Sequence, residues 1–115
     1  MEPKDERRRH PRSKALKPVP VAWMYGTQKH LAQAENLSLG GLFIRTANPP
    51  AAGANIKLLF QAPEGDVRAR AVVRNLVTRQ GAGLAIMSME PEHRLRLARW
   101  LQHLEREAEA QAVLK

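Results

Sequence analysis

Short runs in which apolar and polar residues alternate occupy much of residues 19–87, and they constrain the fold more than any other feature. The alternation is clearest in residues 56–61 and again in residues 67–74. Successive side chains of a β-strand point to opposite faces, so each run predicts a strand with one buried face. Turn signals separate the runs, and this spacing predicts a small antiparallel barrel or sandwich. The predicted strands are Val19–Tyr25, Lys29–Ser38, Leu42–Thr46, residues 56–61, residues 67–74 and Gly83–Met87.

Residues 90–112 follow a helical period instead and predict one C-terminal α-helix. Pro91 suits the first helical position, which places Glu90 at the N-cap. The apolar residues form one stripe, which consists of Leu97, Trp100, Leu101, Leu104 and Ala108. We expect this stripe to pack on the strands, and a homodimer interface is the alternative.

The first 17 residues differ from the rest and predict a flexible basic arm. They hold seven basic and three acidic residues, a net charge of +4 out of the +8 of the whole chain. They show no hydrophobic periodicity, so we expect an arm over residues 1–17 and one folded domain over residues 18–115. A local positive charge favours an anionic partner, which could be nucleic acid, a nucleotide or a membrane surface.

The chemistry-bearing residues argue against an enzyme. The chain has no cysteine, and its four histidines are scattered singly, so we expect no metal and no cofactor. The sequence contains neither a G-x-S-x-G elbow nor a P-loop. No apolar run is long enough for a membrane span and no signal peptide is evident, so a cytoplasmic location is expected.

The first of two short motifs lies in the arm, where Arg8 and Arg12 form an R-x-x-x-R spacing. The arginine fork of donors matches phosphate oxygens and also the O6/N7 edge of guanine. Two arginines four residues apart on an extended arm could straddle a ligand that carries both groups. Taken alone, the motif is also compatible with a solvated tail.

The second motif is Asn36-Leu37-Ser38-Leu39-Gly40-Gly41, which fits [D/N]-x-S-x-x-G. On an extended segment Asn36 and Ser38 would point to the same face, where an amide and a hydroxyl could bond a base or a phosphate. The glycines would let a ligand approach the backbone closely or would adopt a positive φ. The alternative is a hairpin turn in which Asn36 and Ser38 only satisfy the local backbone.

The two motifs together, with 24 residues from Arg12 to Asn36, resemble the signature of the PilZ domain. The flanking segments are similar as well, and the resemblance extends from about Asp5 to Leu104. Besides the motifs it rests on Glu6-Arg7-Arg8-Arg9, Leu42-Phe43-Ile44, Gly81-Ala82-Gly83-Leu84-Ala85-Ile86 and Pro91-Glu92-His93-Arg94.

The resemblance implies a mainly β fold, a six-stranded antiparallel β-barrel with a C-terminal α-helix. It also implies a bacterial, non-catalytic receptor for the second messenger cyclic di-GMP (c-di-GMP). Arg8 and Arg12 would clamp the guanines and phosphates of this ligand. Asn36 and Ser38 would bond guanine, and Gly40 and Gly41 would leave room for it.

Three further arginines are supporting candidates for the same site. Arg7 and Arg9 flank Arg8 in the arm. Arg74 stands where some family members carry tryptophan, so its guanidinium could stack on a purine face. The alternative for Arg74 is a solvated strand residue.

The expected mechanism is a transition of the arm from mobile to ordered. The dianionic ligand would screen the arginines and hold the arm against the barrel, creating a surface for a downstream protein partner. Two other functions stay open at this point. One is a small basic β-barrel that binds nucleic acid through its arm, and the other is a PilZ adaptor that binds no nucleotide.

Overall fold

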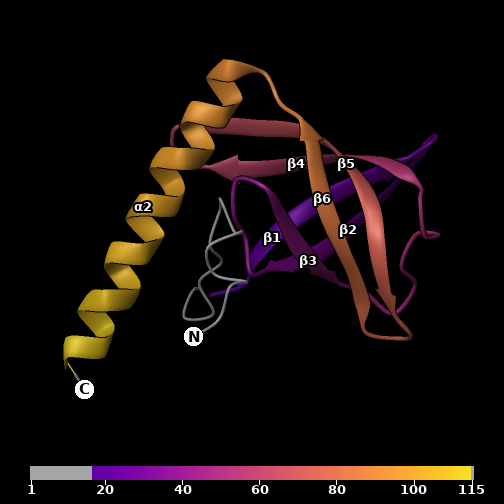
Figure 1. The fold of residues 1–115 in the computed structure, drawn as a ribbon. Coiled ribbons are helices and arrows are strands. Elements are labelled where there is room, and N and C mark those ends of the chain that lie inside the picture. Colours follow the sequence, from indigo (N-terminus) through magenta and orange to yellow (C-terminus); the bar gives the residue numbers. More distant parts are fainter. Residues whose placement is uncertain (1–16, 115) are drawn as a thin grey trace, which may run out of the picture.

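The computed structural model of the chain describes residues 17–114, which form six strands and one helix (Figure 1). The elements are β1 (Val19–Tyr25), β2 (Gln28–Glu35), β3 (Gly41–Arg45), β4 (Asn55–Ala62), β5 (Gly65–Val77), β6 (Gly81–Ser88) and α2 (Pro91–Leu114). The strands close into an antiparallel barrel in the order β1-β2-β3-β6-β5-β4. The predicted six-stranded barrel with a C-terminal helix is therefore confirmed.

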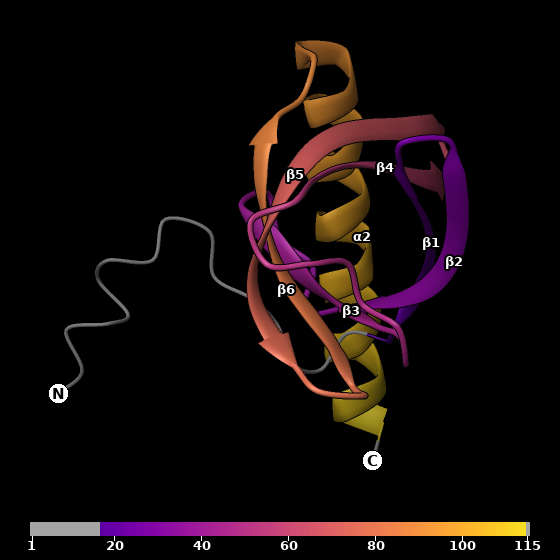
Figure 2. The same ribbon diagram turned by 90° about the vertical axis from the view of Figure 1, so that its right-hand side faces the viewer.

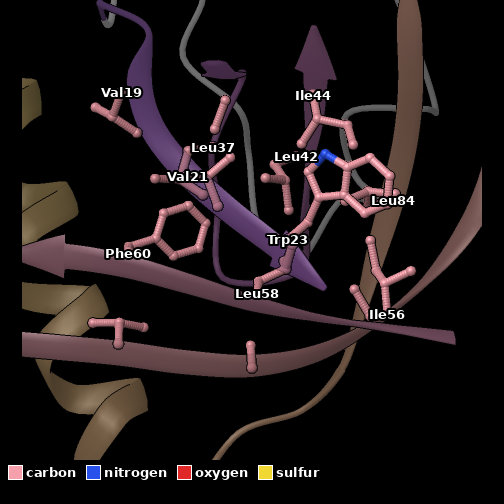
Figure 3. Close-up of a cluster of buried hydrophobic side chains, with 14 of the residues drawn as sticks. Val19, Val21, Trp23, Leu37, Leu42, Ile44, Ile56, Leu58, Phe60 and Leu84 are labelled. Atoms are coloured by element: carbon pink, nitrogen blue, oxygen red, sulfur yellow. The ribbon is translucent and has the colours of Figure 1, made fainter. Parts of the chain in front are cut away.

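The apolar side chains that alternate along the strands fill the barrel interior. Ile56, Leu58 and Phe60 of β4 are buried, whereas Lys57 and Gln61 between and beyond them are exposed. Figure 3 shows Phe60, Leu58 and Ile56 converging with side chains of β1, β3 and β6 on one cluster. The period-2 pattern thus identifies the inner face of the barrel correctly.

Trp23 is the largest side chain of the barrel interior. It lies near the end of the barrel away from the helix (Figure 3). It is 3% exposed, and its ring stacks on His30 at a centroid distance of 4.2 Å. The indole Nε1 has no hydrogen-bond partner among the described residues. A buried N–H without an acceptor lowers stability, so the stacking and apolar contacts must offset its cost.

Helix α2 lies across one end of the barrel, as the two views at right angles show (Figures 1 and 2). Leu97 is fully buried, and Trp100 meets Phe60 edge to face at a centroid distance of 6.2 Å. The apolar stripe of the helix thus packs on the strands, as predicted. Pro91 is the first helical residue, and the carbonyl of Glu90 accepts the amide of Arg94 at 2.9 Å, which matches the predicted start.

Four strands differ in length from their predictions: β4 and β6 extend beyond residues 56–61 and Gly83–Met87 at both ends, and β2 and β5 differ for structural reasons. Strand β2 ends at Glu35 rather than at Ser38, because Asn36 adopts a φ of +54° that an extended strand does not allow. Strand β5 runs over 13 residues, longer than residues 67–74, and its ladder with β6 contains two register shifts. Such irregularities let a long strand bend around a small barrel.

No part of the described helix α2 is both long enough and apolar enough to cross a bilayer.

Candidate functional site

The connection between β2 and β3, residues Asn36–Gly40, lies at the end of the barrel that faces α2 (Figure 1). The chain also begins its first strand there, because Val19 of β1 pairs with Ala34 of β2, two residues before Asn36. The segment that precedes β1 therefore joins the barrel next to this loop. The sequence motif of the loop and the junction with the basic arm share one location.

Ser38 is the structural centre of the loop. Its side chain is buried, with 3% of the residue exposed. The hydroxyl donates to the carbonyl of Gly41 and accepts the amides of Gly40 and Gly41, each at 3.2 Å. A serine hydroxyl has one donor and two acceptor positions, so all three are used within the loop.

The expectation that Asn36 and Ser38 share one face of an extended segment is wrong. The positive φ of Asn36 turns the chain before Ser38, and Ser38 points into the loop instead of outward. Asparagine tolerates this left-handed conformation better than most residues because its short amide bonds locally. For Ser38 the structure matches the alternative, in which the hydroxyl forms hydrogen bonds only with the backbone of its own loop.

Asn36 itself remains available for a ligand. It is half-buried, and its side chain makes no hydrogen bond to another residue within the described part of the chain. Its backbone position is defined by the strand on one side and by buried Leu37 on the other. The amide is thus presented from a fixed position with its donors and acceptor unused by residues 17–114.

Two further contacts hold the loop against the barrel. Leu37, 4% exposed, inserts into the hydrophobic core. The carbonyl of Gly40 accepts the amide of Ile86 on β6 at 3.0 Å. The loop is therefore held by β2 and β3, which it connects, and by β6. A ligand would meet a preformed surface rather than a flexible one.

The outer faces of β3 and β6 beside the loop carry glycine and alanine together with one large ring, that of Phe43. Gly41 pairs with Ala85, and Phe43 pairs with Gly83, which in turn pairs with Asn75 of β5. Residues opposite one another in a ladder point to the same face, and the alternate residues of these strands are buried. The result is a strip, two strands wide, of small residues beside the Phe43 ring, onto which a flat ring system could lie.

Gly81, at the start of β6, lies beneath the Phe43 ring of this strip. A side chain there would place its Cβ 1.9 Å from the carbonyl oxygen of Ile44 and 2.8 Å from the ring of Phe43. Phe43 thus packs over a position that only glycine can occupy. In contrast, Gly40 and Gly41 are not among the glycines for which a positive φ is observed, which are Gly26, Gly53, Gly65 and Gly81.

Arg74 borders the strip on its far side. It is exposed and occupies the register shift of β5 between Val73 and Asn75. Strand β5 is two strands from β3, a separation of about 10 Å at the usual spacing of hydrogen-bonded strands. A long side chain on this bulge can reach over the strip toward a ligand held at the loop.

The arginines of the arm, Arg7, Arg8, Arg9 and Arg12, lie outside the described residues. Arg12 is seven residues before Val19, a stretch that spans at most about 25 Å when extended. The length of the arm is therefore compatible with contacts to the loop and to the strip.

The described residues have no arrangement suited to holding a metal. Within residues 17–114, no three histidine, cysteine, aspartate or glutamate side chains lie together so that they could bind a metal ion. The site offers the Asn36 amide and the Arg74 guanidinium, neither of which has a side-chain partner among residues 17–114, beside the strip of β3 and β6, and all of these are suited to binding. Asn75, next to Arg74, was not predicted, because a bulge that turns a residue onto this face leaves no mark in the residue pattern.

Comparison with known proteins agrees with this architecture. A sequence model of a protein family, the PilZ domain, matches residues 6–103. No curated protein is significantly similar to the chain.

Three solved structures show how widely this fold recurs. The inhibitor of motility MotI/DgrA of Bacillus subtilis is 17% identical, with a TM-score of 0.68 over 84% of this chain and 50% of that chain. The MrkH–c-di-GMP complex of K. pneumonia is 19% identical, with a TM-score of 0.73 over 90% of this chain and 55% of that chain. The PilZ domain of Escherichia coli YcgR with c-di-GMP is 21% identical, with a TM-score of 0.72 over 92% of this chain and 97% of that domain. The chain thus spans about half the length of the first two proteins.

Proposed function

Because the chain belongs to the PilZ domain family, we propose that it is a non-catalytic bacterial receptor for c-di-GMP. Two of the structures that it resembles, those of MrkH and of the YcgR PilZ domain, contain this ligand. The family and these complexes support the ligand class.

One observation carries the proposal. The pairing of Val19 with Ala34 places the start of the barrel beside the Asn36–Gly40 loop. The arm that carries Arg8 and Arg12 therefore joins the barrel next to the loop that carries Asn36. Two motifs that are separated in the sequence can then act on one ligand.

Each residue has a distinct role in this site. Arg8 and Arg12 bind the guanines and phosphates of the ligand through charge-assisted hydrogen bonds. Asn36 bonds the edge of a guanine. Ser38 acts indirectly, since its hydroxyl is used to shape the loop.

The remaining residues of the site provide space and stacking. Gly40 and Gly41 leave room beside the strip of β3 and β6, and Arg74 stacks its guanidinium on a purine face. Arg7 and Arg9 support the arm by adding positive charge near the phosphates.

The signal is relayed by ordering of the arm over residues 1–17 against the single domain over residues 18–115. Arginines that repel one another in the free protein are drawn together by the dianionic ligand. The ordered arm then presents a new surface to a downstream protein.

Calorimetric titration of the full chain with c-di-GMP at physiological salt tests the function. Saturable binding of c-di-GMP is expected, with no binding of GTP or of a short DNA duplex. Replacing Arg12 with alanine should remove a charge-assisted contact and weaken binding by roughly ten- to a hundredfold. Arg94→Ala, which removes an exposed arginine near the start of α2 that belongs to neither motif, is the matched control and should bind like the wild type.

Absence of binding to c-di-GMP, together with an unshifted melting temperature, would reject the receptor function. If the DNA duplex bound instead, with a steep dependence on salt, the chain would be a nucleic-acid-binding barrel. Wild-type affinity in both Arg12→Ala and Asn36→Ala would refute the site while retaining the function.

A further inference from the structure

A second surface lies on the side of the barrel away from the Asn36–Gly40 loop. It is a groove of about 1060 Å³ formed by the outer faces of β1, β4 and β5, by the end of β6 with the β6–α2 connection, and by the first turns of α2. Strands β1 and β4 lie across the barrel from β3 and β6, and no residue that lines the groove belongs to the Asn36–Gly40 loop or to the strip beside it, so the groove is separate from the proposed nucleotide site. Figure 1 shows the β6–α2 connection arching above the ends of β4 and β5.

Four cationic side chains line this groove: Lys57, Arg68, Arg70 and Arg96. Arg96 is already engaged, because it donates to Glu92 and to the carbonyl of Asp66, each at 2.7 Å. The other three are exposed, and none forms an ion pair with any of residues 17–114. The groove therefore carries positive charge that the described part of the chain does not neutralise.

Two of these charges oppose each other directly. Lys57 of β4 and Arg70 of β5 are partners in the antiparallel ladder. Like charges in directly opposite positions destabilise a sheet. A sequence that retains such a pair departs from local optimisation, and such departures are characteristic of functional sites.

The groove also has an apolar part and an acidic rim. Met24, Leu59 and Met89 contribute half-buried apolar side chains, and Asp66 and Glu90 contribute carboxylates. None of the lining residues is phenylalanine, tyrosine or tryptophan, the rings on which nucleic-acid bases stack. Carboxylates beside the cations would also repel a phosphate backbone.

We propose that this groove binds an acidic segment of a protein partner, one in which glutamate or aspartate alternates with apolar residues. The acidic side chains would pair with Lys57, Arg68 and Arg70, and the apolar ones would cover Met24 and Leu59. Mixed charge and apolar contacts of this kind fit a peptide better than a nucleic acid. This inference does not depend on c-di-GMP binding.

Fluorescence anisotropy of the full chain with a labelled peptide of alternating glutamate and leucine tests the proposal. Saturable binding is expected, and Lys57→Glu should weaken it at least tenfold. The matched control is Arg94→Glu, an identical change of charge on an exposed position of α2 outside the groove, which should bind within twofold of the wild type. Lys57→Glu should melt no lower than the wild type, because the new carboxylate would face Arg70. Its affinity for c-di-GMP should also be unchanged, which separates this groove from the nucleotide site.

Four results would overturn the proposal. These are no saturable binding of the peptide, equal losses in Lys57→Glu and Arg94→Glu, and equal affinity for a peptide with glutamine in place of glutamate. The fourth is tighter binding of a single-stranded oligonucleotide than of the peptide, lost in Lys57→Glu, which would assign the groove to nucleic acid.

Discussion

Replacing Ser38 with alanine removes a hydroxyl that makes three hydrogen bonds in the Asn36–Gly40 loop. The carbonyl of Gly41 keeps a partner, because it also accepts the backbone amide of Ser38 at 2.9 Å. The amides of Gly40 and Gly41 lose their acceptor. Gly41 is buried, so water cannot easily replace the hydroxyl there, whereas Gly40 is half-buried.

The cost follows from these environments. A buried amide left without an acceptor costs about 1–3 kcal/mol, and a partly hydrated one costs less. We therefore expect Ser38→Ala to lower the free energy of unfolding by about 2 kcal/mol. For a domain of about 100 residues this corresponds to a fall in melting temperature of roughly 8–16 °C.

Urea denaturation of the full chain measures this loss. Thr46→Ala is the matched control, because the Thr46 hydroxyl also accepts a loop amide, that of Asn48 at 3.2 Å, but in an exposed position. The control should lose no more than about 0.5 kcal/mol. If Ser38→Ala unfolded like the wild type yet lost c-di-GMP binding more than tenfold, Ser38 would contact the ligand and its assignment to the loop would be refuted.

Three further predictions concern positions where the backbone or the core leaves little freedom. Asn36→Gly should preserve the free energy of unfolding, whereas Asn36→Ala should lower it by about 1 kcal/mol in urea denaturation because of the positive φ of Asn36. Both variants should weaken c-di-GMP binding, and wild-type binding by either one would show that the Asn36 amide is not part of the site. Gly81→Ala should lower the free energy of unfolding by more than about 3 kcal/mol, because the new Cβ would overlap the carbonyl of Ile44. Gly26→Ala, with open space around it, should lower it by about 1 kcal/mol, and similar losses in the two variants would contradict the clash. Leu97→Ala should cost about 2.7–5 kcal/mol by denaturation, and a loss under 1 kcal/mol would show that α2 is not docked by this side chain.

The strands were predictable because burial of one face imposes an alternation that survives in the residue pattern. Residues 56–61 illustrate this, since the apolar positions face the core and the polar ones face outward as expected. The start of α2 was also predictable from the sequence, because proline has no backbone N–H and the first helical position leaves that N–H without an intrahelical partner.

The detail of the site was not readable in the same way. The side-chain directions of Asn36 and Ser38 depended on the assumption of an extended backbone, and one positive φ reversed the outcome for Ser38. Placing Arg74 on a bulge required the register between β5 and β6, which the sequence does not encode in any local signal. The same holds for the facing pair of Lys57 and Arg70, because two residues 13 positions apart become neighbours only through the ladder.

The two tryptophans of the chain make its two structural layers separately visible to fluorescence. Trp23 lies in the barrel interior, stacked on His30, and Trp100 lies at the contact between α2 and Phe60. In a Trp23→Phe variant, the remaining indole would report on the release of the helix alone. In a Trp100→Phe variant, the emission would follow the opening of the barrel, so the order in which helix and barrel come apart can be observed without any attached dye.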